Sequence, residues 1–255
     1  MLERYLKMGK TDSIGYCSNC PRNQLGICPS ILKILMQENE FQSPKQFTLT
    51  AKHYLYHQGE HNHEIYILRE GWVLLTKVSE QGKRQIIRSV LPGEMIGFQA
   101  NISGPAVYSA VALVDSVVCS VPDFMKMCSV HPELTLKLVW TQACENTMTE
   151  LYMANIAHCD AREKVAFMAL ELYQRMKFRG LNKGYTIPFP LKQVDIADTL
   201  GLTHTHVNRT LHKLEQENLL SLYKHELTIL DYEKLNALVG LELHALETCD
   251  IDCGH

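Results

Sequence analysis

The sequence lacks the features that mark membrane and secreted proteins. It contains no run of about 18 apolar residues, the length that a membrane-spanning helix needs. Its opening segment, MLERYLKMGK, has no apolar core of a secretory signal peptide. We therefore expect a soluble, cytoplasmic protein with no membrane partner.

A basic surplus and the fingerprints of common enzymes are also missing. The formal net charge is −3, so the composition gives no sign of nucleic-acid binding. No nucleophile elbow, phosphate-binding loop or dinucleotide-binding glycine motif is present. An acidic average can nevertheless hide a small basic surface, so the composition leaves nucleic-acid binding open.

Cysteine, in contrast, is abundant. Nine cysteines are many for the cytoplasm, where stable disulfides are rare, and an odd number cannot pair completely within one chain. Buried thiols, metal ligands and redox sensors are the alternatives. Three of the nine form a C-x2-C-x7-C motif in CSNCPRNQLGIC, at Cys17, Cys20 and Cys28.

The pattern of apolar residues divides the chain. After a short amphipathic helix expected at 31–40, short apolar runs between about 46 and 122 are separated by turn signals such as Glu70-Gly71 and Pro92-Gly93. This spacing predicts short antiparallel strands in a barrel or sandwich. Glycine is then absent from 123 to 179, and helices are expected at 132–158 and 161–178.

The 132–158 helix carries a stripe of apolar or small residues at steps of three and four. Such a stripe fits a coiled-coil seam between two copies or a face packed on the core, and the pattern alone does not separate them. The stripe consists of Leu134, Leu138, Thr141, Cys144, Met148, Leu151 and Asn155.

Residues 191–219 predict a helix-turn-helix. A short helix from Gln193 to Leu200 is followed by Gly201, which can adopt positive φ in a tight turn, and by Thr203, a favourable N-cap. In this motif the second helix enters the DNA major groove. The exposed side chains at its beginning are expected to read bases: His204, Thr205, Asn208 and Arg209. A helical hairpin that packs on a partner protein is the alternative.

Two further stretches resemble the CRP/FNR superfamily of transcription regulators. GEHNHEIYILREGWV (59–73) is similar to the strand-turn-strand signature of its β-roll, and GEMIGF (93–98) is similar to the segment that follows. The resemblance implies an α+β protein with a cyclic-nucleotide-binding-like β-roll, a long dimerisation helix and a winged helix-turn-helix. The expected domains are a cysteine segment at 1–30, the β-roll at 31–130, the helix at 131–160, the DNA-binding domain at 161–240 and a tail at 241–255.

The cysteines make the chain resemble the oxygen-sensing FNR sub-family. The resemblance implies a [4Fe–4S] cluster on Cys17, Cys20, Cys28 and Cys119, the last in SVVCSV, and release of DNA when oxygen or nitric oxide destroys the cluster. A zinc site with the same ligands, or cluster-free redox thiols, is the alternative. Cyclic nucleotides are not expected, because the family's phosphate-binding arginine is missing beside Tyr108-Ser109.

The implied partners are a palindromic promoter in double-stranded DNA, RNA polymerase and a second copy of the chain, and no enzymatic activity is expected. The chain departs from the FNR pattern at Thr205 and Asn208, and at Lys83, where the polymerase-contacting loop would carry an acidic residue. A metalloenzyme centred on His61 and His63 is the rival class. The tail motif Cys249-x3-Cys253 with His255 is a weak metal candidate.

Overall fold

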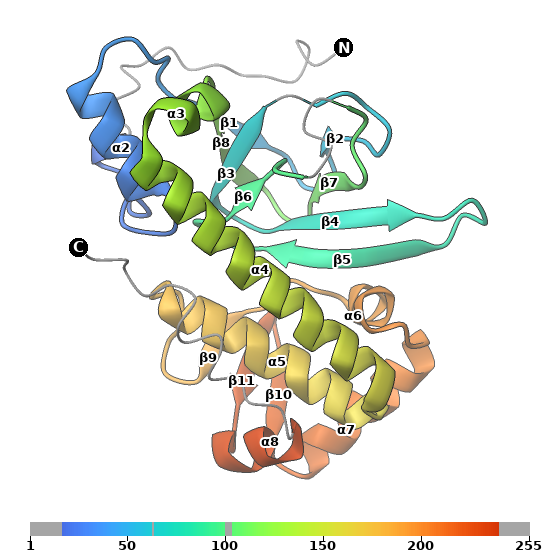
Figure 1. Cartoon of the computed structure of the whole chain (residues 1–255). Coiled ribbons are helices and arrows are strands. Elements are labelled where there is room, and N and C mark those ends of the chain that lie inside the picture. The colour runs from blue at the N-terminus through green and yellow to red at the C-terminus, as the bar shows by residue number, and fades with distance from the viewer. Residues whose placement is uncertain (1–16, 63, 100–103, 240–255) are drawn as a thin grey trace. The chain divides into compact units, whose positions relative to one another are not determined.

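The structure is a computed structural model, and it describes residues 17–62, 64–99 and 104–239. The chain divides into two compact units, Met1–Val139 and Trp140–His255. Figure 1 shows the strands of the first unit in blue to green and the helices and strands of the second in yellow to red. The tail cysteines and His63 lie outside the described residues.

The first unit is built on two four-stranded antiparallel sheets, as the β-roll prediction requires. One sheet has the order β1-β8-β3-β6 and the other β2-β7-β4-β5. The strands are β1 (Lys45–Leu49), β2 (Tyr54–Tyr56), β3 (Ile65–Glu70), β4 (Val73–Val78), β5 (Arg84–Val90), β6 (Met95–Ile96), β7 (Ser109–Ala112) and β8 (Ser116–Val121).

Strand β3 is apolar on both faces because both faces are buried. Tyr66 and Leu68 point into the core between the two sheets, whereas Ile65 and Ile67 point to a second core outside the first sheet. Side chains of a strand alternate between the two faces of a sheet, so a strand covered on both sides loses the usual polar alternation. This explains the continuous apolar run in EIYIL.

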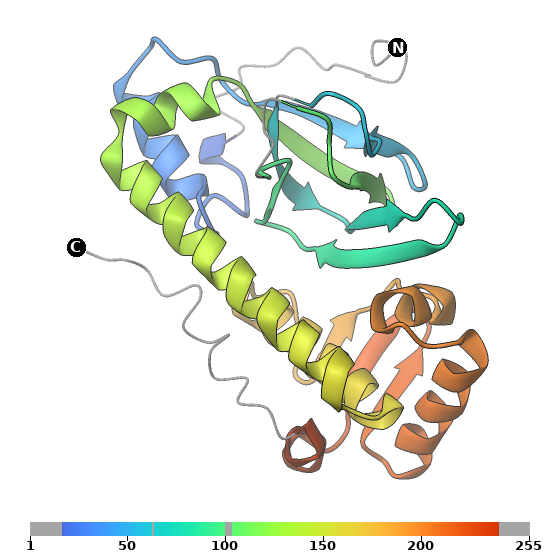
Figure 2. The same ribbon diagram turned by 45° about the vertical axis from the view of Figure 1, so that its right-hand side comes forward.

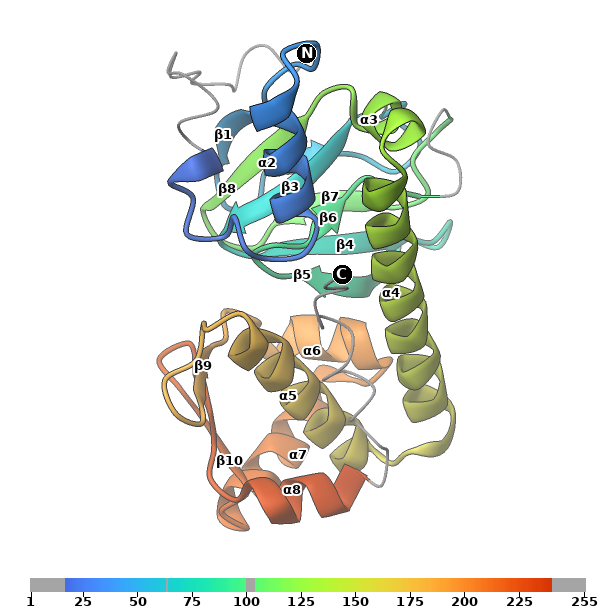
Figure 3. The same cartoon turned by 60° about the vertical axis from the view of Figure 1, so that its left-hand side comes forward.

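Helices cover the outer face of the first sheet. Helix α2 (Cys28–Gln37) lies across β8 and β3 (Figure 3), with Ile31 and Ile34 in the outer core. The sequence placed this helix at 31–40; it begins three residues earlier because Pro29 is well accommodated in a first turn. Helix α3 (Phe124–Val130) contributes Phe124 and Met127 to the same core.

Helix α4 (Pro132–His158) has the bounds that the sequence predicted. The coiled-coil interpretation of its apolar stripe has to be corrected. Leu134 and Leu138 are buried in the outer core of the first unit, and Asn155 is completely buried, so these positions face the protein. Leu136, Val139 and Met153, on the opposite side of the helix, are 70%, 59% and 67% exposed. The core-packed interpretation of the stripe is therefore the correct one at both of its ends.

The second unit is a winged helix-turn-helix. Figure 2 shows helices α6 and α7, in shades of orange, beside a small antiparallel sheet of order β10-β11-β9. Its elements are α5 (Ala161–Phe178), β9 (Thr186–Pro188), α6 (Gln193–Leu200), α7 (His204–Gln216), β10 (Leu220–Tyr223), β11 (Glu226–Ile229) and α8 (Tyr232–Val239).

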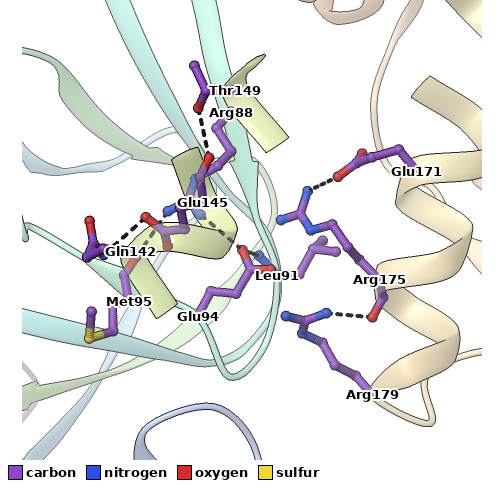
Figure 4. Close-up of polar contacts among 10 residues, drawn as sticks. All are labelled: Arg88, Leu91, Glu94, Met95, Gln142, Glu145, Thr149, Glu171, Arg175 and Arg179. Atoms are coloured by element: carbon purple, nitrogen blue, oxygen red, sulfur yellow. Dashed lines mark hydrogen bonds and ion pairs between the residues drawn. The ribbon is translucent and has the colours of Figure 1, made fainter. Parts of the chain in front are cut away.

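Helix α5 forms the centre of this unit. Asp160 and Glu163 form a capping box at its beginning, with Asp160 accepting hydrogen bonds from the backbone N–H groups of Arg162 and Glu163. Ten of its side chains are buried, among them Glu171, which is completely buried. The Glu171 carboxylate is 2.6 Å from the guanidinium of Arg175, one turn later on the same helix. Figure 4 shows these two side chains facing each other. The pairing explains how a carboxylate is tolerated in this core.

Candidate functional sites

Cys119 lies in the middle of the first sheet. On β8 it is directly opposite Gln46 of β1 and Ile67 of β3. Side chains opposite one another in a sheet share a face, so Cys119 points to the helix-covered outer side, where it is half-buried. Arg69 reaches across β8 and donates a hydrogen bond to Gln46, and it also pairs with Glu70 at 3.3 Å.

The N-terminal cysteines lie on a series of tight turns. The backbone N–H of Cys20 donates to the carbonyl oxygen of Cys17 at 3.2 Å, and that of Asn23 donates to Cys20 at 3.1 Å. Gly26 has a φ of +56°, and a Cβ there would lie 2.8 Å from the carbonyl oxygen of Gly93. Only glycine fits so close to the β-roll, and Cys28 follows it at the start of α2.

The four cysteines influence one another electrostatically. Burial, then the charges of Cys20, Cys119 and Cys17, raise the pKa of the Cys28 thiol far above its usual value. Burial, then Cys17 and Cys20, raise the pKa of Cys119 to about 12, while Arg69 lowers it. The end of the C-x2-C-x7-C motif lies on the same side of the first sheet as Cys119, because Cys28 packs on the outer core that contains Ile67, the residue opposite Cys119. Cys119 follows Cys28 about 90 residues further along the chain.

Four thiols from two segments fit the ligand number and type of an iron–sulfur cluster or a zinc site. Their arrangement is not that of a closed metal site: within 17–62, 64–99 and 104–239, no three His, Cys, Asp or Glu side chains are placed to hold a metal ion. All seven cysteines in these ranges are free of disulfides.

Tyr108 and Ser109, where the family's phosphate-binding arginine would be expected, make contacts within the roll. Ser109 is buried, and its hydroxyl oxygen accepts a 2.8 Å hydrogen bond from the backbone N–H of Gln58. Tyr108 packs against Tyr56 with 6.5 Å between ring centroids. No arginine lies between 104 and 121 to pair with a cyclic phosphate. His61, of the rival enzyme class, is exposed and forms a β-bridge with Pro105.

The helix-turn-helix has the local geometry that its sequence predicts. Gly201 ends α6 with a φ of +66°, and the Thr203 hydroxyl accepts a 3.2 Å hydrogen bond from the backbone N–H of His206. Val207, Leu211 and Leu214 are buried on the inner side of α7. Of the predicted DNA-contacting residues, His204, Thr205 and Arg209 are exposed, and Asn208 is half-buried.

One residue beside this group was not predicted. Gln193, the first residue of α6, accepts a 3.1 Å hydrogen bond from the side-chain amide of Asn208. The two are 15 positions apart, and no local pattern in the sequence indicates that they meet. The hairpin of β10 and β11 turns at Lys224 and His225, which have φ values of +49° and +63° without a glycine.

Comparison with known proteins identifies both units. Residues 46–131 match the cyclic nucleotide-binding domain, and residues 163–238 match the Crp-like helix-turn-helix domain. The transcriptional activatory protein AadR of Rhodopseudomonas palustris is 30% identical over 74% of this chain and 79% of its own. The chain belongs to the CRP/FNR family of transcription regulators.

Other CRP/FNR proteins align over nearly the full length. The nitrogen fixation regulation protein FixK of Bradyrhizobium diazoefficiens is 27% identical over 88% of this chain and 94% of its own. The fumarate and nitrate reduction regulatory protein of Vibrio cholerae is 23% identical over 89% and 91%. The structure of FixK2 from Bradyrhizobium japonicum superimposes with a TM-score of 0.71, at 25% identity, over 78% of this chain and 99% of that one.

These relatives confirm the predicted family, the β-roll with helix-turn-helix fold and the expectation of a regulator rather than an enzyme. None of the helices in the described ranges combines the length and the apolar character that a bilayer crossing needs. FixK and the Vibrio regulator both match along most of this CRP/FNR chain, so overall similarity does not decide which signal it senses.

Proposed function

We propose that this CRP/FNR protein is a homodimeric regulator in which Cys17, Cys20, Cys28 and Cys119 hold a [4Fe–4S] cluster that controls promoter binding. The observation that carries the proposal is the place of Cys28: it packs on the outer core that contains Ile67, and Ile67 is directly opposite Cys119 in the sheet. Such a cluster would supply a centre that oxygen or nitric oxide degrades. The cysteine segment is taken as 1–30 and the β-roll as 31–130.

The outer core gives the cysteine segment a physical connection to α4. Cys28 packs against this core, which contains Ile27 and Ile31 beside it and also Leu134 and Leu138 of α4. Well-packed cores transmit small displacements because they contain few voids. Ligation of Cys28 would therefore fix the packing of the first turns of α4, and loss of ligation would loosen it.

The exposed side of α4 supports pairing of two copies. Leu136, Val139 and Met153 belong to a row with alternating steps of three and four residues, the repeat of a coiled-coil seam. The full row is Leu136, Val139, Ala143, Asn146, Glu150, Met153 and Ala157. With 131–160 as the dimerisation helix, two copies of the DNA-binding domain at 161–240 would reach two half-sites of a palindromic promoter.

On that promoter, the exposed end of α7 would provide the base contacts. His204, Thr205, Asn208 and Arg209 lie within its first two turns, where side chains of a recognition helix reach base edges. RNA polymerase is the further partner expected of a promoter-bound activator. The loop between β4 and β5 carries Lys83 immediately before β5, where an acidic residue would be expected for a polymerase contact, so we do not assign such a contact to this loop.

Purification without oxygen tests the cofactor directly. Iron and acid-labile sulfide should be present at about four each per chain, with a brown colour that air removes. Gel shifts with genomic fragments, before and after exposure to air, should then show loss of DNA binding. Zinc without sulfide would mean that the four cysteines form a structural zinc site. Full DNA binding by the metal-free protein would contradict control of DNA binding by a cluster.

A further inference from the structure

Gln193 and Asn208 connect the two helices of the helix-turn-helix through their side chains. The Nδ2 atom of Asn208, on α7, donates a 3.1 Å hydrogen bond to the Oε1 atom of Gln193, on α6. Both residues are half-buried at the surface that carries the exposed Thr205 and Arg209. The contact therefore lies inside the group of residues proposed to read bases.

The backbone under this contact is fixed from several sides. The backbone N–H of Lys192 donates a 3.0 Å hydrogen bond to the Asp195 carboxylate, and this bond caps the beginning of α6. Leu200 of α6 and Val207 of α7 are completely buried. With Gly201 and Thr203 defining the turn between the helices, the positions from which the two amides approach each other are set by the fold.

In the structure this hydrogen bond orients the Asn208 amide with its Nδ2 atom toward Gln193. A primary amide has two N–H donors and one carbonyl oxygen, and a free amide can rotate to exchange them. Because one N–H of Asn208 is hydrogen-bonded to Gln193, its other N–H and its Oδ1 atom remain for contact with a base. Bidentate pairing of asparagine with an adenine edge uses one donor and one acceptor.

We infer that Gln193 is a positioning residue that sets the base preference of Asn208 without reading a base itself. The inference rests on the proposed function, in which Asn208 contacts bases. The preference expected at the Asn208 position is adenine. Gln193→Ala would leave the amide free to rotate, and discrimination at that one base should fall by about three- to ten-fold.

A double-mutant cycle tests this with the full-length dimer. The wild-type motif is first obtained by selection from randomised duplex DNA. Gln193→Ala, Asn208→Ala and the double variant are then measured on sites that differ only at each base in turn. Both single variants should flatten the same base position, and the double variant should match Asn208→Ala. Thermal unfolding confirms that each variant is folded.

Two matched variants separate positioning from other roles. Gln193→Glu keeps the acceptor and should keep the adenine preference, although its negative charge lowers affinity for every sequence. Lys192→Ala, at the neighbouring exposed position, should weaken binding uniformly. If Gln193→Ala weakens binding to every sequence equally, or changes the preference at a different base, the inference about Gln193 is wrong while the proposed function is unaffected. An unchanged motif in Asn208→Ala overturns base reading by Asn208 and the inference together.

Discussion

The Tyr152 hydroxyl donates a 3.0 Å hydrogen bond to the completely buried carboxylate of Glu171. Arg175 approaches the other oxygen of this carboxylate at 2.6 Å, and the Arg179 guanidinium donates to the carbonyl oxygen of Arg175 (Figure 4). Tyr152 lies on α4 and Glu171 on α5, so a buried charge joins the proposed dimer helix to the central helix of the DNA-binding domain. Burial, and then the charge of Glu171, raise the pKa of Tyr152, which keeps its hydroxyl protonated.

Glu171→Gln should lower the free energy of unfolding of the second unit by about 2–4 kcal/mol, because Arg175 would keep a partly buried charge without its ionic partner. Tyr152→Phe should cost about 1 kcal/mol, the contribution of one hydrogen bond. Urea unfolding measures both changes. Tyr223→Phe, at a tyrosine that is 68% exposed, is the control and should have no effect.

Cys119→Ser should abolish the visible absorbance and the bound iron of anaerobically purified protein, because it removes one of the four proposed ligands. Cys144→Ser is the matched control: Cys144 is half-buried on α4, far in sequence from the proposed ligands, and its loss should leave colour and iron unchanged. Retention of both in Cys119→Ser would assign the fourth ligand to another residue.

Cyclic AMP and cyclic GMP should not bind at micromolar concentrations. Ser109 is buried and already accepts a hydrogen bond from Gln58, and residues 104–121 contain no arginine for the phosphate. Arg88, on β5, is within 3.9 Å of Glu94 and is thereby paired with a carboxylate. Isothermal calorimetry with each nucleotide checks this, and a saturable micromolar isotherm would overturn the sub-family assignment.

Sequence patterns predicted the elements better than the faces they bury. Helices at 132–158 and 161–178 were expected from the local sequence, which has no glycine from 123 to 179, and α4 and α5 have these bounds. The stripe on α4 was ambiguous, because a helix face is buried by whatever packs on it, and for Leu134 this is a core built from distant strands. The Gln193–Asn208 contact was missed for the same reason: it depends on how two helices meet.

Arg209→Ala should weaken binding to the selected DNA site by about 1–3 kcal/mol and relax one base position, as loss of a bidentate guanine contact would. Arg209 is exposed within the first two turns of α7, where such a contact can form. Affinity for the selected site and for random DNA is measured at one salt concentration. An equal loss on both would make Arg209 a phosphate contact.

The exposed row on α4 contains one carboxylate, at Glu150, between the apolar residues at its two ends. Asn146, also in the row, donates a 2.6 Å hydrogen bond to this carboxylate. In a parallel dimer two copies of Glu150 would approach each other across the seam, and like charges oppose pairing. A seam weakened in this way forms a marginal dimer, whose population a bound cluster can shift with a few kcal/mol.

Glu150→Ala should therefore favour the dimer by at least about five-fold in dissociation constant, since removing the repulsion contributes on the order of 1 kcal/mol. Sedimentation of the air-exposed protein, at one micromolar concentration, should show more dimer in the variant than in the wild type, and gel shifts should show DNA binding in air. Glu145→Ala is the matched control, because Glu145 lies off the exposed row, close to Gln142. A wild-type protein that stays fully dimeric in air would mean that oxygen acts by reorienting DNA-binding domains within a permanent dimer.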